Sequence, residues 1–190
     1  MSAPDMTRPG PWQTLFPRAL QLMDHLESVT QKPHWTFGGG TVLMLRHNHR
    51  QSKDIDLFVP DPQYLGYVNP RISEVAETIC ADYRAGALFV KLILAAGEID
   101  VVVGPALTDP GYDLVEFEGR QLRVETSAEI IAKKDVAPWQ RGQCARLVRS
   151  LHCRACRARR TRTGATILQQ AWGCIHRSAR LESGPGEAGV

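Results

Sequence analysis

The sequence lacks any long run of apolar residues. Although 43% of its 190 residues are hydrophobic, an ordinary share for a globular protein, no stretch approaches the roughly 20 apolar residues of a membrane-spanning helix. The first residues, MSAPDMTRPGPWQ, also lack the charged start and apolar core of a signal peptide. We therefore expect a soluble cytoplasmic protein with no membrane partner.

Lysine is absent after residue 134. Residues 1–134 hold 13 Lys and Arg against 17 Asp and Glu, a net charge of −4, whereas residues 135–190 hold ten Arg and three acidic residues, a net charge of +7, which gives +3 for the chain. Four of the five cysteines also lie in the second part. A chain of this length suits one domain with an appendage, so we expect a domain over residues 1–134 and a separate Arg- and Cys-rich segment over residues 135–190.

Helical and strand patterns alternate along the first part. We expect helices over residues 12–29, 41–47, 70–83 and 127–134, a short strand leading from residue 34 into a glycine turn, a strand over 54–60, and hairpins over 87–104 and 113–126. Pro17 marks the start or a kink of the first helix, and Ser127 caps the last, with Glu129 close behind. Four apolar residues of the third helix are expected to share one buried face: Ile72, Val75, Ala76 and Ile79. The sum is an α+β fold, a mixed β-sheet flanked by helices.

Two aspartates, Asp54 and Asp56, stand two residues apart on an expected strand. Successive strand residues point to opposite faces, so both carboxylates point the same way while Ile55 faces the core. Such a pair repels itself unless a cation lies between, and its oxygens suit Mg²⁺ or Mn²⁺ bound to the phosphates of a nucleotide. Asp100, on a later strand, would complete a cluster of three carboxylates.

Three glycines, residues 38–40, precede the second helix. A glycine turn lets the backbone approach a ligand closely, and the exposed N–H groups at a helix start bind phosphate oxygens. Thr41 adds a hydroxyl at the same place. A phosphate-binding turn followed by a metal-binding carboxylate pair indicates nucleotidyl transfer, in which metal ions orient a triphosphate.

Each of these motifs also has a structural interpretation. Asp54 and Asp56 could lie on a solvated strand edge, the glycines could form a simple turn, and Asp100 could be a surface residue of a hairpin, because short motifs often match by chance. Their order favours the catalytic interpretation: strand, Gly-Gly, helix, basic loop, then an Asp-apolar-Asp strand.

The segment GGGTVLMLRHNHRQSKDIDLF resembles the nucleotidyltransferase AbiEii/AbiGii toxin family, a branch of the DNA polymerase β-like nucleotidyltransferase superfamily. The resemblance runs from about Trp35 to Lys134. It implies a toxin of a toxin–antitoxin pair that transfers a nucleotide from an NTP to an acceptor such as tRNA, with a cognate antitoxin as partner. It also implies roles for single residues: metal ligation by Asp54, Asp56 and Asp100, and nucleotide binding by Gly39, Gly40, Thr41, Arg50, Ser52 and Lys134.

The chain departs from the family pattern after Lys134. The family continues into a helix similar to ARDLFDL, whereas residues 144–150 here read CARLVRS. One set of codons compatible with this stretch is TGC GCG CGA CTT GTT CGA TCT, and reading this set one nucleotide later gives ARDLFDL. We infer a frameshift near Lys134, and we expect the residues after about 135 to be poorly ordered.

Two other interpretations of residues 135–190 stay open. Cys153 and Cys156 beside His152, with Cys174 and His176 further on, could bind zinc, although the spacing is only loosely typical of zinc sites. The arginines could instead form an RNA-binding arm. The chain would then be a non-catalytic basic RNA-binding or zinc-binding protein, and a third possibility is a truncated, inactive relative that still binds nucleotide.

Overall fold

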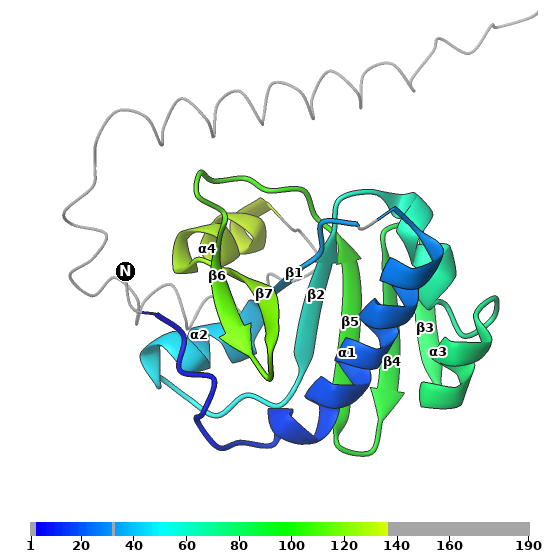
Figure 1. The fold of residues 1–190 in the computed structure, drawn as a ribbon, viewed down its shortest axis with the longest axis horizontal. Helices are drawn as coiled ribbons and strands as arrows, with labels where there is room; N and C mark the ends of the chain where they lie inside the picture. Colours follow the sequence, from blue (N-terminus) through cyan, green and yellow to red (C-terminus); the bar gives the residue numbers. More distant parts are fainter. Residues whose placement is uncertain (1–2, 32, 137–190) are drawn as a thin grey trace, which may run out of the picture. The chain divides into compact units, whose positions relative to one another are not determined.

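A computed structural model describes residues 3–31 and 33–136 of the chain (Figure 1). Its helices and strands follow in this order: α1 (Trp12–Val29), β1 (Thr36–Gly38), α2 (Gly39–His47), β2 (Ile55–Val59), the 3₁₀ helix η1 (Pro62–Val68), α3 (Glu74–Ile79), β3 (Tyr83–Gly86), β4 (Phe89–Leu94), β5 (Gly97–Val103), β6 (Tyr112–Phe117), β7 (Arg120–Glu125) and α4 (Ser127–Val136). Most of the elements expected for residues 1–134 are present. The expectations for disorder, zinc and RNA binding after residue 136 lie outside the described residues.

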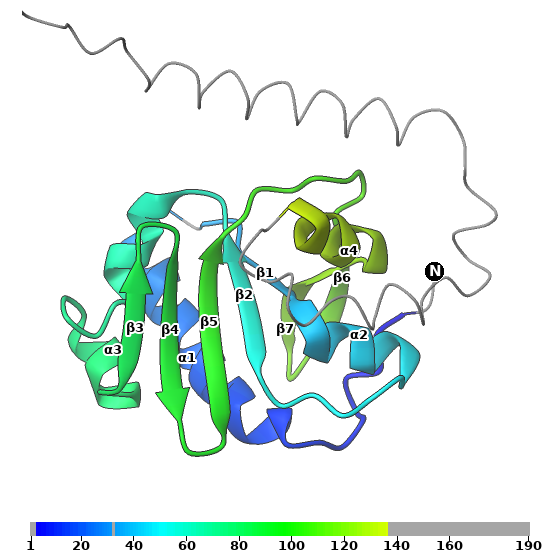
Figure 2. The same cartoon turned by 180° about the vertical axis from the view of Figure 1, so that it is seen from behind.

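A seven-stranded mixed sheet, ordered β3-β4-β5-β2-β1-β7-β6, forms the centre of this part. The pairs β2–β5 and β1–β7 are parallel, and the other neighbours are antiparallel. Helix α1 lies on one face of the sheet, and α2 and α4 lie on the other, as the two opposite views show (Figures 1 and 2). The expected α+β fold with a mixed sheet flanked by helices is confirmed.

The strand alternation separates an apolar face from a polar one. Ile55 and Leu57 of β2 are fully buried, on the face that α1 covers, and Phe37 of β1 packs there against Phe16 with ring centroids 4.8 Å apart. Burying each such side chain stabilises the fold by about 1.5–3 kcal/mol. Asp56, between Ile55 and Leu57, therefore points to the opposite face, toward α2 and α4, as the sequence predicts.

Helix α1 has the predicted bounds, whereas helix α2 starts earlier than predicted. Helix α1 begins at Trp12 and contains Pro17, so Pro17 is not its start. The proline removes one helical N–H, but the helix buries eight residues against the sheet, and this packing outweighs the loss. Helix α2 begins at Gly39, two residues before the predicted start at Thr41.

The prediction of a single helix over residues 70–83 is wrong. Helix α3 covers only Glu74–Ile79 because the Ser73 side chain caps its first turn, accepting a hydrogen bond from the Ala76 N–H. Ile72 precedes this cap and is 71% exposed, so it does not belong to a buried face. The chain then enters β3, an edge strand paired with β4.

Both predicted hairpins are present, and the second turns at Glu118 and Gly119, which have positive φ angles of 50° and 77°. The predicted cap of α4 is displaced by one residue. The Thr126 hydroxyl accepts the hydrogen bond from the Glu129 N–H, whereas Ser127 is the first residue of the helix and its hydroxyl lies 2.7 Å from His47 Nε2. Thr126 and Glu129 thus have the spacing of a capping box.

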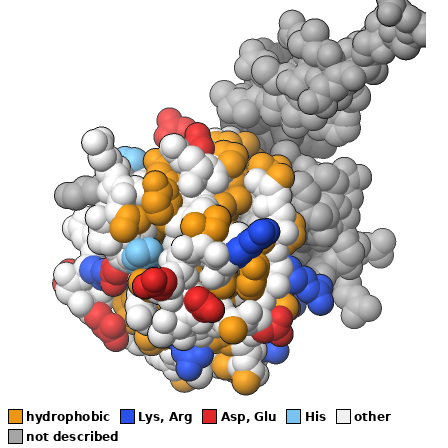
Figure 3. Space-filling model, turned by 90° about the vertical axis from the view of Figure 1, so that its right-hand side faces the viewer, with side chains coloured by type: hydrophobic (Ala, Val, Ile, Leu, Met, Phe, Trp, Pro, Cys, Tyr) orange, Lys and Arg blue, Asp and Glu red, His pale blue; other side chains and the backbone are white. Residues whose placement is uncertain are grey.

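The end of the sheet that carries β3 and α3 exposes hydrophobic side chains among charged ones (Figure 3). Tyr67, Ile72, Leu88 and Phe89 are the large hydrophobic residues exposed in η1, near α3 and in the β3–β4 turn and β4. Within residues 3–31 and 33–136, no helix is both long and apolar enough to span a bilayer.

Candidate functional site

The glycine turn between β1 and α2 lies directly over Asp56. Strands β1 and β2 are antiparallel with Gly38 opposite Asp56, so the chain turns into α2 beside this carboxylate. Gly39 has a φ of +71°, and a Cβ there would lie 1.8 Å from Asp56 Oδ2. The Gly40 N–H donates a hydrogen bond to the same oxygen at 3.3 Å. Only glycine at position 39 allows this approach.

Arg50 and Ser52 converge on the start of α2. A Cβ added to Gly40 would lie 3.3 Å from Arg50 Nη2 and 3.3 Å from Ser52 Oγ. The loop between α2 and β2 therefore brings a guanidinium and a hydroxyl to the helix N-terminus, where free N–H groups and the helix dipole already favour anions. This combination has the chemistry of a phosphate-binding site.

The buried Thr41 side chain stabilises the loop between α2 and β2. Its side chain is fully buried, and its hydroxyl donates to the Asp54 carbonyl at 2.5 Å and lies 3.0 Å from Ser52 Oγ. Thr41 thereby fixes Ser52 and the start of β2 relative to the glycine turn. Its direct contact with a nucleotide stays a prediction.

Two of the three predicted carboxylates, Asp56 and Asp100, lie at neighbouring positions of β2 and β5. Asp56 is directly opposite Asp100 in this parallel pair. Asp54 precedes β2, and its Oδ1 accepts a hydrogen bond from the Glu98 N–H at 3.0 Å. Asp100 Oδ2 pairs with Lys91 Nζ at 3.0 Å, while Asp100 Oδ1 is buried and has no hydrogen-bond partner among the described residues.

Burial raises the pKa of both central carboxyl groups. For Asp56 the positive charge of Lys134 and the Gly40 N–H oppose this effect. For Asp100 burial, with the negative charge of Asp56 added, raises the pKa to about 6 in spite of Lys91. Two half-buried carboxylates that repel each other favour a nearby cation.

As the side chains stand in residues 3–31 and 33–136, no three His, Cys, Asp or Glu groups are arranged to hold a metal ion. The donor chemistry nevertheless fits a divalent cation. Carboxylate oxygens are the ligands that Mg²⁺ and Mn²⁺ prefer, and Asp100 Oδ1 is a buried acceptor with no hydrogen-bond partner in the part of the chain that the structure describes. A cation bound beside Asp56 and Asp100 would relieve their repulsion.

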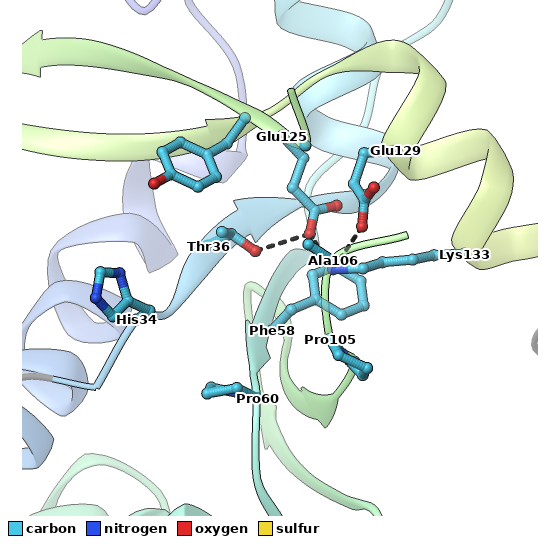
Figure 4. A pocket seen from close by; sticks show the side chains of 12 residues that line it. His34, Thr36, Phe58, Pro60, Pro105, Ala106, Glu125, Glu129 and Lys133 are labelled. Carbon is cyan, nitrogen blue, oxygen red and sulfur yellow. Dashed lines mark hydrogen bonds and ion pairs between the residues drawn. The ribbon is translucent and has the colours of Figure 1, made fainter. Parts of the chain in front are cut away.

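Helix α4 carries Lys134 toward this site and is anchored by buried charges. Lys133 pairs with Glu125 of β7 and with Glu129 one turn earlier. Glu129 also accepts hydrogen bonds from the N–H groups of Leu107 and Thr108. Figure 4 shows Lys133 beside Glu125 and Glu129, with the Thr36 hydroxyl donating a hydrogen bond to Glu125. Sequence reasoning missed this network, although the spacing of four residues between Glu129 and Lys133 in the predicted helix was a usable signal.

A cavity of about 190 Å³ adjoins the network on the same face of the sheet as Asp56. Phe58, two residues after Asp56 in β2, forms one wall, with Pro60 and Pro105 beside it (Figure 4). Lys133 Nζ lies 4.2 Å from the centre of the Phe58 ring. The pocket is therefore mostly apolar, and Lys133 lies over its aromatic wall.

Comparison with known proteins gives one family match. The family described as nucleotidyl transferase AbiEii toxin, type IV TA system, matches residues 21–146. A crystal structure of a protein from Thermotoga maritima, described as a putative nucleotidyltransferase, shares 16% sequence identity with this chain. The match covers 73% of this chain and 95% of that chain, with a TM-score of 0.39. A likeness of this size adds no weight to the fold or the function. No curated protein matches the chain.

Proposed function

Because this chain belongs to the AbiEii nucleotidyltransferase toxin family, we propose that it is a divalent-metal-dependent enzyme that transfers a nucleoside monophosphate from an NTP to an RNA acceptor. The observation that carries this proposal is the position of Asp56, which lies under the Gly39–Gly40 turn and directly opposite Asp100. Phosphate-binding groups and metal-binding groups are thereby adjacent, as nucleotidyl transfer requires.

We assign the triphosphate to the start of α2. In this proposal the helix start at Gly39 and Gly40 and the side chains of Arg50 and Ser52 bind its oxygens, because Arg50 Nη2 and Ser52 Oγ both lie beside Gly40. Lys134 adds a positive charge close to Asp56. Thr41 acts through Ser52, which it holds in place.

Asp54 and Asp56 are the proposed ligands of Mg²⁺ or Mn²⁺. When bound, the ion neutralises the triphosphate oxygens and stabilises the charge that develops on the leaving group. Asp54 is held by the Glu98 N–H and Asp56 by the Gly40 N–H, so both carboxylates are oriented before the substrate arrives. Asp100 was predicted as a third ligand, and that role stays a prediction.

The transfer step needs a proton acceptor near the attacking hydroxyl. The hydroxyl oxygen of the acceptor forms a bond to the α-phosphorus, the bond from the α-phosphorus to the bridging oxygen breaks, and pyrophosphate leaves with its electron pair. We propose that Asp100 takes the hydroxyl proton. Burial and the charge of Asp56 raise its pKa to about 6, close to the pH at which a general base is effective.

The family supports an antitoxin as partner, and the acceptor is part of our proposal. A toxin of a toxin–antitoxin pair implies a cognate antitoxin, and we propose RNA, with tRNA as the first candidate, as the acceptor in the cytoplasm. The positive charges of Arg50 and Lys134 at the site support a polyanionic substrate.

A second candidate function is nucleotide binding without transfer. Residues 144–150 read CARLVRS and lack the two aspartates of the family helix ARDLFDL. If those acidic groups are needed for catalysis, this chain binds an NTP through the glycine turn but does not transfer it. The frameshift that we infer near Lys134 is the cause in this case.

The test is an assay of label transfer from each α-labelled NTP to total tRNA in the presence of Mg²⁺. We expect transfer by the wild-type chain and its loss in Asp56→Asn, with the fold retained. Asp82→Asn, which removes an exposed carboxylate, is the matched control and should behave as wild type. Retained transfer by Asp56→Asn would overturn the assignment of Asp56, and NTP binding without transfer by the wild-type chain would favour the second candidate.

A further inference from the structure

Lys91 stands next to the carboxylates on the polar face of the sheet. It lies directly opposite Asp100 in the antiparallel pair β4–β5, and Asp100 lies directly opposite Asp56 in β5–β2. Directly opposite residues point to the same face, so the three side chains form a row across neighbouring strands. The order of charges along the row is positive, negative, negative.

The Lys91 ammonium is fixed at one end of this row. Its Nζ lies 3.0 Å from Asp100 Oδ2 and 2.5 Å from Glu98 Oε2. The side chain is 26% exposed, and two carboxylates hold it, so leaving its place would break two charge-assisted contacts. Asp100 Oδ2 is therefore already paired with the positive charge of the Lys91 ammonium.

Two-metal sites place a second cation about 3.5–4 Å from the first. A second divalent ion on Asp100 would have to displace the Lys91 ammonium or lie beside it, where the two positive charges repel each other. Such an ion would neutralise the negative charge of Asp100. In this protein the Lys91 ammonium neutralises that charge.

We propose that Lys91 takes the place of the second cation, so that the site holds a single divalent ion, the one that accompanies the triphosphate. This inference rests on the proposed function because it concerns the same carboxylates. It assigns Lys91 a positioning role: it fixes Asp100 beside Asp56 and limits the number of metal ions at the site to one.

The test counts Mn²⁺ ions bound to the complex of the full chain with a non-hydrolysable NTP analogue, from the electron paramagnetic resonance of free Mn²⁺ and from isothermal titration calorimetry. We expect one ion on the wild-type chain and two on Lys91→Met, since the substitution releases Asp100 and Glu98. Lys91→Arg keeps the charge and should bind one ion. Arg84→Met, which removes a positive charge from the residue opposite Lys91 in β3, is the matched control and should also bind one.

A double variant locates the added ion. Lys91→Met combined with Asp100→Asn should return the count to one, because the second ion needs the Asp100 carboxylate. Lys91→Gln serves as a second neutral variant if Lys91→Met unfolds, which circular dichroism would detect.

Three results would overturn the inference. Two equivalent ions on the wild-type chain would refute it and leave the proposed function intact. A count of one on folded Lys91→Met or Lys91→Gln would refute the role of Lys91 alone. Absence of Mn²⁺ binding by the wild-type chain would refute the proposed metal dependence and this inference with it.

Discussion

The missing side chain of Gly39 decides whether the candidate site can form. The positive φ of Gly39 and the 1.8 Å distance from a hypothetical Cβ to Asp56 Oδ2 are two separate reasons for glycine at this position. The sequence indicated both the turn and the carboxylate pair. The antiparallel pairing that places Gly38 opposite Asp56 could not be read from the residues alone, because it depends on the register of two strands 16 residues apart along the chain.

A Gly39→Ala variant tests this position. We expect the unfolding free energy to fall by about 1–2 kcal/mol from the left-handed backbone alone, and transfer to fall by about 100-fold because the glycine turn must move away from Asp56. Urea unfolding and the transfer assay measure the two effects. Gly66→Ala is the matched control, since a Cβ at Gly66 meets nothing within 4 Å, and it should change neither quantity. Wild-type transfer by Gly39→Ala would show that the close approach is not needed.

Helix α4 packs on the sheet through buried ion pairs as well as through the buried Ile130. The sequence predicted the helix from Ser127 as its cap and from Glu129 close behind, but it did not predict the ion pairs of Lys133 with Glu125 and Glu129. Those pairs join charged residues of α4 and β7, and charged side chains are usually exposed to solvent. These side chains are buried because the helix packs on the sheet. Lys91 was missed for the same reason: the hairpin over residues 87–104 was predicted, but its register, which brings Lys91 opposite Asp100, was not.

The pH dependence of stability tests the anchor of α4. Burial raises the pKa of Glu125, although Lys133 opposes the effect. A raised carboxyl pKa contributes stability that is fully present below the unfolded value near 4.5 and is lost as the pH rises through the higher folded value. We therefore expect the unfolding free energy of the wild type to fall relative to that of Glu125→Gln as the pH rises from 4.5 to neutrality.

Urea unfolding at a series of pH values measures this difference. Glu77→Gln, which removes an exposed carboxylate from α3, controls for the loss of one negative charge. A difference between wild type and Glu125→Gln that stays constant, or that grows in favour of the wild type as the pH rises, would contradict the effect of burial on Glu125.

The amino-acid composition of the chain changes at the end of α4. The family match runs over residues 21–146, past Lys134, whereas the lysine-free, arginine-rich composition begins at residue 135. A change of reading frame near Lys134 would account for the composition and for the missing ARDLFDL pattern, and it stays a prediction because the family match continues past Lys134. Fold class, family and the order of motifs were therefore predictable for residues 1–134, because local patterns specify them, and residues 135–190 followed no pattern of a packed domain.

Resequencing the coding DNA across codons 130–150 from the native source tests the frameshift. We expect one added or missing nucleotide, whose correction restores ARDLFDL. The corrected chain should then show greater transfer activity and better solubility, because the restored helix covers apolar surface. A frame confirmed as written would contradict the frameshift and would return attention to zinc and RNA binding by residues 135–190.

The β6–β7 hairpin has a practical use that follows from its turn. Glu118 and Gly119 lie at the opposite end of β7 from Thr126 and α4, and the space around Gly119 is open. A fluorescent label or a short affinity tag inserted between these two residues would stay away from the glycine turn and would leave both chain termini free. The protein could then be immobilised or followed during antitoxin binding without altering residues 135–190.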